Sequence, residues 1–328
     1  MLADRGRESG AALLTVLLIV AVITVIAATA LERLRLATRL TGNALSIDQS
    51  RGYAMAAESL MLTRVDRLLG QHPTRVTLDG GWSGRPYQLV VPGGLVTATV
   101  ADGGNCFNLN GLVQKLPDGK LTARPEAIKQ FARLMRLVGI SDQLARPIAA
   151  AAADWIDSDN DPQPQGAEDS HYANGEPGYR TAGAMMADPS ELRAVAGVTP
   201  ALYGKIAPWV CALPIVEPSK INVNTLSSEQ APLFAMLLPD TLDVARAQAL
   251  LLTRPPQGFA SPFEFWKLPA SSGITPDQAS SEQVAVTTQW FALTVKVELG
   301  EAELNEIALI DATEAPARLA FRSWGDPS

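Results

Sequence analysis

The chain has 328 residues, of which 47% are hydrophobic and 19% are charged, and its net charge is −7. These values are typical of a globular protein with length for a membrane anchor and one or two further domains. Lys and Arg total only 27, and no basic block is long enough to follow a phosphate backbone, which argues against nucleic acid as a partner. The chain contains only two histidines, His72 and His171, so a catalytic or zinc site built from histidines is not expected.

The N-terminus places a charged leader in front of an apolar run. Residues 1–10 contain Arg5 and Arg7 and end at Gly10. Residues 11–31 carry no charged side chain, and as a helix they would span about 30 Å, the thickness of a bilayer's hydrocarbon core. The arginines before this run predict a cytoplasmic N-terminus and export of everything after it.

This junction resembles the leader of a type IV prepilin, which a prepilin peptidase cuts after glycine. The resemblance implies cleavage between Gly10 and Ala11, and an uncleaved single-pass anchor is the alternative that the motif leaves open. Most pilins carry Glu as the fifth mature residue, where it pairs with the amine of a neighbouring subunit, whereas here that position is Thr15. Because Thr15 cannot form that ion pair, we expect the subunit at the end of a polymer rather than inside it.

Beyond residue 31 the helical spacing of apolar residues continues to Gly70, which predicts one long helix, half in the bilayer and half packed on a soluble domain. Two alternating runs, 87–91 and 95–100, flank Pro92-Gly93-Gly94 and predict a β-hairpin. A long N-terminal helix followed by antiparallel strands is the arrangement of a pilin. The sequence therefore indicates an α+β fold in which that helix packs on an antiparallel sheet.

The middle of the chain departs from this plan. Helical spacing over 125–138, 142–155 and 190–195, with few strand signals between them, predicts a large all-helical domain inserted in the sheet. The last segment returns to alternating strand patterns. The expected segments are a leader (1–10), a membrane-spanning half-helix (11–31), a pilin-like helix with the first strands (32–118), the inserted helical domain (119–214), an Asn-containing strand with a second small helical module (215–280), and C-terminal strands of the pilin-like sheet (281–328).

Cys106 and Cys211 lie in the part that is expected to be exported. An oxidising compartment favours a disulfide between them over two buried thiols, although the sequence does not show whether they meet.

Two short helices around the turn 255–258 resemble a helix-hairpin-helix module, which binds DNA phosphates through backbone amides. The cationic side chains beside it are matched by as many carboxylates. A DNA-binding minor pilin of a competence pilus is therefore the weaker alternative.

The segment 157–169 is rich in acidic residues and is the strongest candidate for a functional site in the chain. Asp157, Asp159 and Asp161 alternate, and Glu168 follows eleven residues after Asp157, which matches positions 1, 3, 5 and 12 of an EF-hand loop. Asp169 adds a fifth acid. Pro162 stands where an EF-hand needs glycine, so we expect a loop of different geometry.

Five acids in so short a segment repel one another if they are unpaired, so we favour a structural calcium ion, with these five residues as its ligands, over a solvated acidic turn. Magnesium prefers fewer protein ligands, and zinc prefers His or Cys. A loop that binds a cation is a poor general acid, and no Ser/His/Asp arrangement or phosphate loop is present. An enzyme is therefore not expected, and a calcium-dependent hydrolase is kept only as a competing hypothesis.

Four motifs together resemble the K-type minor pseudopilins of type II secretion systems (the GspK family). These are Phe107-Asn108-Leu109-Asn110, Asp154-Trp155-Ile156-Asp157-Ser158-Asp159, Gly166-Ala167-Glu168-Asp169 and Ile221-Asn222-Val223-Asn224. The resemblance implies a pilin fold with a large helical insertion that binds calcium. It also implies a non-catalytic subunit at the tip of a pseudopilus, which initiates assembly and helps export folded proteins across the outer membrane.

In this family the anchor would lie in the inner membrane and the soluble domain in the periplasm. The partners that the resemblance implies are the I- and J-type minor pseudopilins, the major pseudopilin, the prepilin peptidase and the inner-membrane assembly platform. A minor pilin of a true type IV pilus is the remaining alternative, since only the insertion and the acidic loop separate the two.

Overall fold

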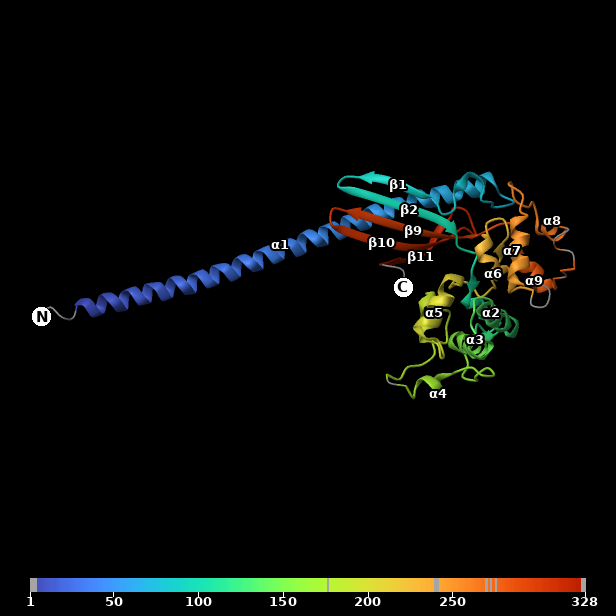
Figure 1. Ribbon diagram of the computed structural model, residues 1–328, viewed down its shortest axis with the longest axis horizontal. Helices are drawn as coiled ribbons and strands as arrows, with labels where there is room; N and C mark the ends of the chain where they lie inside the picture. Colours follow the sequence, from blue (N-terminus) through green and yellow to red (C-terminus); the bar gives the residue numbers. More distant parts are fainter. Residues whose placement is uncertain are drawn as a thin grey trace.

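The computed structural model describes residues 5–175, 177–238, 242–268, 271, 273–274 and 276–325. A single helix, α1 (Arg5–Gln71), extends far from the rest of the molecule and packs on the sheet only with its second half (Figure 1). Helices α6 to α9 lie at the end of the head farthest from the N-terminus, and α2 to α5 lie below the sheet in this view.

Residues 11–45 of α1 are exposed, and the segment from Ala11 onward is apolar and long enough to cross a membrane. In its second half Ala54, Ala57, Met61 and Val65 are buried. Their spacing of three to four residues places them on one face of the helix. That face packs on the central strands of the sheet, so the predicted long helix and its half-packed character are confirmed.

The sheet is antiparallel and has the strand order β1-β2-β9-β10-β11. Its strands are β1 (Pro86–Val91), β2 (Gly94–Asp102), β9 (Trp290–Leu299), β10 (Ala302–Asp311) and β11 (Arg318–Trp324). The predicted hairpin is β1–β2, with Val90 opposite Leu95. Strand β2 pairs with β9, from Gly94 opposite Leu299 to Asp102 opposite Phe291. Everything between these neighbouring strands is therefore an insertion.

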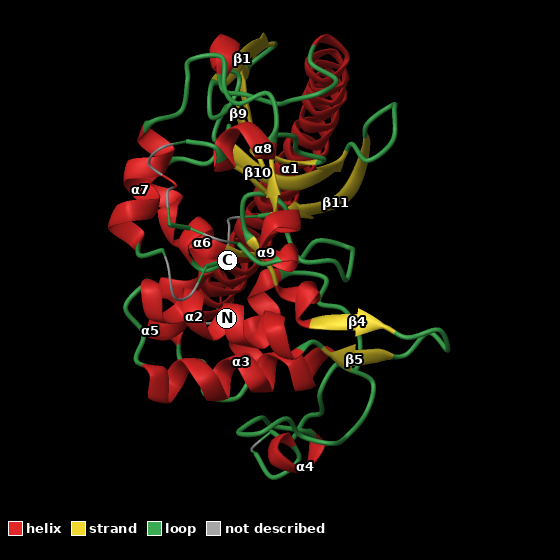
Figure 2. Cartoon of the chain, turned by 90° about the vertical axis from the view of Figure 1, so that its right-hand side faces the viewer, coloured by secondary structure: helices red, strands yellow, loops and turns green. Residues whose placement is uncertain are grey.

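The insertion holds helices α2 to α9 (Figure 2) and, within the described ranges, three short strand pairs. The helices are α2 (Pro125–Leu137), α3 (Asp142–Ile156), α4 (Asp169–Tyr172), α5 (Pro200–Ile206), α6 (Ala231–Ala235), α7 (Val244–Leu252), α8 (Pro262–Trp266) and α9 (Gln278–Gln283). The strand pairs are β3 (Phe107–Asn108) with β6 (Val210–Cys211), β4 (Val113–Lys115) with β5 (Leu121–Ala123), and β7 (Ile221–Asn222) with β8 (Val284–Ala285).

We expected an inserted domain at 119–214 and a second module at 215–280. The two segments share one hydrophobic core. One cluster of buried side chains contains Phe131 of the first segment and Phe234 of the second. Arg133 on α2 reinforces this continuity, because its guanidinium donates hydrogen bonds to the carbonyls of Ala235, Leu238 and Leu242. The predicted helix at 190–195 is a short 3₁₀ helix at Pro189–Ala194.

The neck of the insertion is closed by a disulfide and by buried amides. Cys106 and Cys211 form a disulfide with their Cα atoms 5.8 Å apart, beside the β3–β6 pair. The Asn110 side chain bonds Met186 and Leu213. The Asn224 side chain exchanges two hydrogen bonds with the backbone of Phe259.

Candidate metal centre

Helix α3 delivers two carboxylates to the start of the acidic loop. Asp154 lies in the last turn of α3, and Asp157 is its C-terminal cap, so the two side chains are three residues apart and share one side of the helix. Glu168 arrives from the other end of the loop, where it is the N-terminal cap of α4. All three are buried, with exposed fractions of 0%, 1% and 3% respectively.

One oxygen from each of Asp154, Asp157 and Glu168 lies within 4.8 Å of the others. Both carboxylate oxygens of Asp157 and both of Glu168 are buried and have no hydrogen-bond partner. A buried charged oxygen without a partner is costly, since nothing replaces the water that it loses on folding. The group therefore calls for a positive charge or for protons.

The pKa values of the cluster also indicate that it needs a positive charge or protons. Burial, with the charges of Asp159, Glu168 and Asp154 adding to it, raises the pKa of Asp157 to about 8. Burial, with the charge of Asp154 next in size, raises the pKa of Glu168 to about 7. Without a cation, these carboxyls resist ionisation at neutral pH.

Asp154 also determines the shape of the loop. Its Oδ1 accepts a hydrogen bond from the Gln163 amide at 3.0 Å, and its Oδ2 accepts one from the Ala167 amide at 2.7 Å. A Cβ atom at Gly166 would lie 1.9 Å from Asp154 Oδ2, so only glycine fits there. Asp154 thus holds the loop in place so that Glu168 lies opposite Asp157.

Sequence reasoning did not select Asp154 as a ligand, although its spacing from Asp157 on a predicted helix was a usable signal. The structure does not bring the other three predicted ligands into the group of three. Asp159 and Asp161 are exposed, and Asp159 Oδ1 accepts the Asp161 amide in a local turn. Asp169 Oδ1 instead accepts the Thr181 amide and hydroxyl, both at 3.0 Å. The EF-hand numbering fails because Pro162 and the Asp154 contacts give the loop a different path.

Aromatic rings border the α3 end of this centre. The Trp155 and Tyr172 rings meet edge to face with centroids 5.5 Å apart, and Tyr179 lies 5.1 Å from Tyr172. Apolar rings near the carboxylates lower the local dielectric and strengthen their attraction to a cation. The donors are all carboxylate oxygens, which suit a hard cation such as Ca²⁺ better than zinc. The nearby His171 is exposed and lies outside the group.

The predicted processing site lies within α1. Gly10 and Ala11 are consecutive helical residues. The hydroxyl of Thr15 donates to the carbonyl of Ala12 at 2.8 Å, so its one proton is used within its own helix.

The helix-hairpin-helix resemblance corresponds to α7 and α8 around the turn at Gly258. Arg254 is not available to a phosphate, because its guanidinium donates to the carbonyls of Val223 and Leu226 and burial lowers its pKa. Asn224 fastens the turn through Phe259. This module therefore serves the core of the insertion.

Comparison with known proteins agrees with this architecture. Family models described as type II secretion system (T2SS), protein K match residues 105–215 and 221–287. The chain is 35% identical over 324 residues to the type II secretion system protein K of Pectobacterium carotovorum subsp. carotovorum, covering 98% of both chains. It is 35% identical to the protein of that name from Klebsiella pneumoniae, covering 97% of both.

The chain belongs to the type II secretion system protein K family. A solved structure supports the fold as well. It is a chain of the GspK–GspI–GspJ complex from enterotoxigenic Escherichia coli, with a TM-score of 0.77 and 29% sequence identity, and the match covers 88% of this chain and 99% of that one. The family is a component of a secretion system, and the long apolar helix fits a single-pass anchor with a soluble C-terminal domain.

Proposed function

We propose that this chain is a non-catalytic minor pseudopilin at the tip of a type II secretion pseudopilus. It starts assembly of the fibre and helps export folded proteins across the outer membrane. The N-terminus is cytoplasmic, the anchor lies in the inner membrane and the head lies in the periplasm. The prepilin peptidase cuts between Gly10 and Ala11.

The observation that carries this proposal is the position of the insertion. It is built between two neighbouring strands of the sheet, and it extends from the end of the head far from the membrane-spanning half of α1 to the region below the sheet (Figure 1). A pilin-like subunit stacked beyond it would collide with the α2–α9 helices, whereas the α1 side stays open to subunits below. This shape suits a cap.

The partners follow from the same proposal. The I- and J-type minor pseudopilins are its direct neighbours, since the similar solved chain comes from a complex of the K, I and J proteins. The major pseudopilin continues the fibre, and the inner-membrane platform extracts the subunits from the bilayer. A DNA-binding competence pilin is not favoured, because Arg254 is committed to backbone carbonyls.

We also propose that Asp157 and Glu168, with Asp154, hold a structural calcium ion. Four buried carboxylate oxygens without a hydrogen-bond partner support this assignment. The bound ion would neutralise the carboxylates and join the end of α3 to the start of α4, which fixes a long connection that is otherwise held mainly by Asp154.

The tip function is tested by removing the insertion. Because Asp102 lies opposite Phe291 at the end of the β2–β9 pair, residues 103–290 can be replaced by a two-residue turn. In a strain that lacks the chain, the full-length protein should restore secretion, and the shortened protein should reach the membrane without restoring it. Normal secretion by the shortened protein would refute the proposal that the insertion forms a functional cap.

The calcium assignment is tested by thermal unfolding of the full-length protein in detergent, with calcium and then with excess chelator. At a calcium concentration of 100 times Kd the bound ion adds about 2.7 kcal/mol. Asp157→Asn with Glu168→Gln should abolish the difference, and the matched exposed pair Asp159→Asn with Asp161→Asn should largely retain it. Superimposable wild-type curves would mean that protons, not calcium, neutralise the cluster.

A further inference from the structure

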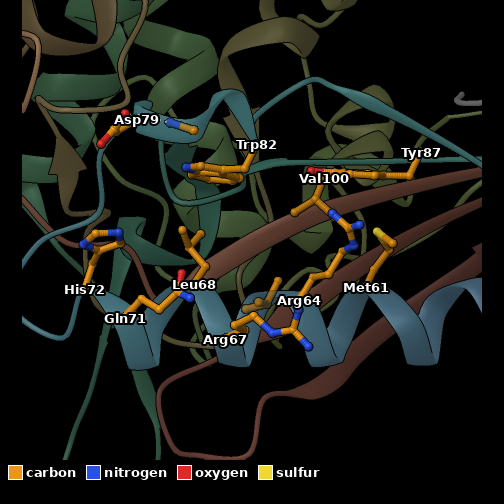
Figure 3. Close-up of a pocket in the computed structure, with 12 residues that line it drawn as sticks. Met61, Arg64, Arg67, Leu68, Gln71, His72, Asp79, Trp82, Tyr87 and Val100 are labelled. Carbon is orange, nitrogen blue, oxygen red and sulfur yellow. Dashed lines mark hydrogen bonds between the residues drawn. The ribbon is translucent and has the colours of Figure 1, made fainter.

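A groove of about 340 Å³ runs between the last turns of α1 and the segment that leads into the β1–β2 hairpin (Figure 3). Met61, Val65 and Leu68 line it from α1, and Trp82 and Tyr87 face them from the other side. An apolar floor between two aromatic rings suits an apolar side chain.

The rim of this groove is cationic. Arg64 and Arg67 line it, and Arg64 lies over the Tyr87 ring with its Cζ 3.8 Å from the centroid. Among the described residues, no carboxylate lies within 4.0 Å of either guanidinium. The one carboxylate of the lining, Asp79, accepts a hydrogen bond from the Gly80 amide.

The charge of this region is opposite to that of the whole chain. Residues 60–90 contain four arginines, two aspartates and no Lys or Glu, a balance of 4 − 2 = +2 in a chain of net charge −7. Asp66, one of the two aspartates, is engaged by the Ala317 amide. A local excess of unpaired guanidinium groups on an acidic protein favours an acidic partner. The excess is too small for a nucleic-acid backbone.

The groove borders an unpaired sheet edge. Strand β1 is the end strand of the sheet, and Val90 on it is 89% exposed. Exposed edge strands are usually covered or blunted, because their free backbone groups pair with other chains. On the α1 side Leu60, Arg64 and Arg67 form one helical stripe that continues toward the exposed stem of α1. A subunit lying alongside α1 would cover the stripe, the groove and this edge together.

We propose that this groove and the outer edge of β1 form the docking surface for an acidic segment of the adjacent minor pseudopilin. The carboxylates of that segment face Arg64 and Arg67, and an apolar side chain enters between Trp82 and Leu68. This inference rests on the proposed function, because it assigns the surface through which the tip subunit contacts its neighbour.

Charge reversal tests the surface in the full-length chain, produced together with its I- and J-type subunits and purified in detergent. Arg64→Glu with Arg67→Glu should weaken association at least tenfold, since like charges then oppose each other. Lys115→Glu with Lys120→Glu makes the same change of charge on the exposed β4–β5 hairpin and should associate as the wild type does. Unchanged thermal unfolding of both variants confirms that they fold.

A second measurement does not depend on charge. A photo-crosslinking amino acid at Leu60, which is 40% exposed on the same helical stripe as Arg64, should capture the I- or J-type subunit. The same group at Ser323 on the opposite edge strand serves as the comparison. Wild-type-like association of the arginine variant, or crosslinks from position 323 with none from position 60, would overturn this surface and leave the proposed function standing. If the wild-type chain associates with neither subunit, the proposed function fails as well.

Discussion

At the scale of single residues, the three buried carboxylates of the acidic loop differ in their hydrogen bonding. Asp154 accepts hydrogen bonds from two loop amides, whereas Asp157 and Glu168 accept none. The first therefore fixes geometry, and the other two supply unbalanced charge. We expect loop shape and ion binding to respond to different substitutions.

Gly166→Ala should destabilise the protein by about 1–3 kcal/mol, because the added methyl group overlaps Asp154 Oδ2 and displaces the loop. Gly204→Ala in α5 is the matched control, since no atom lies within 4 Å of its added Cβ. That control should be neutral or stabilising by up to about 1 kcal/mol. Chemical denaturation measures both, and a neutral Gly166→Ala would show that the loop does not depend on this close contact.

Asn110→Ala should cost about 2–4 kcal/mol, because it leaves the Met186 amide and the carbonyls of Met186 and Leu213 without their buried partner. Asn174→Ala removes one exposed hydrogen bond, to the Ser170 carbonyl, and should change stability by less than about 0.5 kcal/mol. The two free energies of unfolding are compared in urea. Equal effects would contradict the role of Asn110 in closing the neck.

At the scale of elements, α1 is fastened to the sheet by a cluster in which one guanidinium faces two carboxylates. Arg322 on β11 donates from Nε to Glu58 on α1 at 2.8 Å, and the same nitrogen lies 3.5 Å from Glu306 on β10. Glu306 is fully buried. Burial, with the neighbouring Glu58 next in size, raises the pKa of Glu306 to about 7.

This raised pKa makes the helix–sheet contact sensitive to pH. The folded protein holds a proton on Glu306 that the unfolded chain releases near pH 4.5, so stability falls as pH rises from about 4.5 to 7. Between pH 5 and pH 8 the wild type should lose about 2 kcal/mol more than Glu306→Gln, which cannot ionise. Urea unfolding across this range, with calcium kept constant, measures the difference. Parallel pH profiles would exclude this linkage.

The elements also show which features a sequence can predict. Alternation of apolar and polar residues was sufficient to predict that β1, β2, β9 and β10 are strands. Helical spacing of apolar residues was sufficient to predict that α1, α2 and α3 are helices. The pairing of β2 with β9 was not predictable from local pattern, because it joins segments nearly two hundred residues apart. The predicted ligand set differs from the buried group of carboxylates, because the EF-hand pattern counts positions, whereas burial separates Asp157 and Glu168 from the exposed Asp159 and Asp161.

At the scale of the whole molecule, the insertion behaves as one body. Its hydrophobic core joins both of the segments that match the family models, and the ends of the first segment meet at the disulfide. Short strand pairs close each segment at its base. We therefore expect the insertion to unfold cooperatively.

Cys106→Ala with Cys211→Ala opens a loop of 105 residues and should reduce stability by about 3–5 kcal/mol, because the unfolded chain gains conformational freedom. Denaturation of the oxidised wild type and of the double variant measures this loss. A variant as stable as the wild type would show that the core and the buried amides alone close the neck.

The unbroken course of α1 has a mechanical consequence. The helix runs through 67 residues without interruption, which corresponds to about 100 Å, and its second half is held by the sheet. A rod with no joint does not absorb displacement by bending at one point. Axial movement imposed on its membrane end is therefore delivered to the sheet, and through the sheet to the insertion, as translation of the whole body.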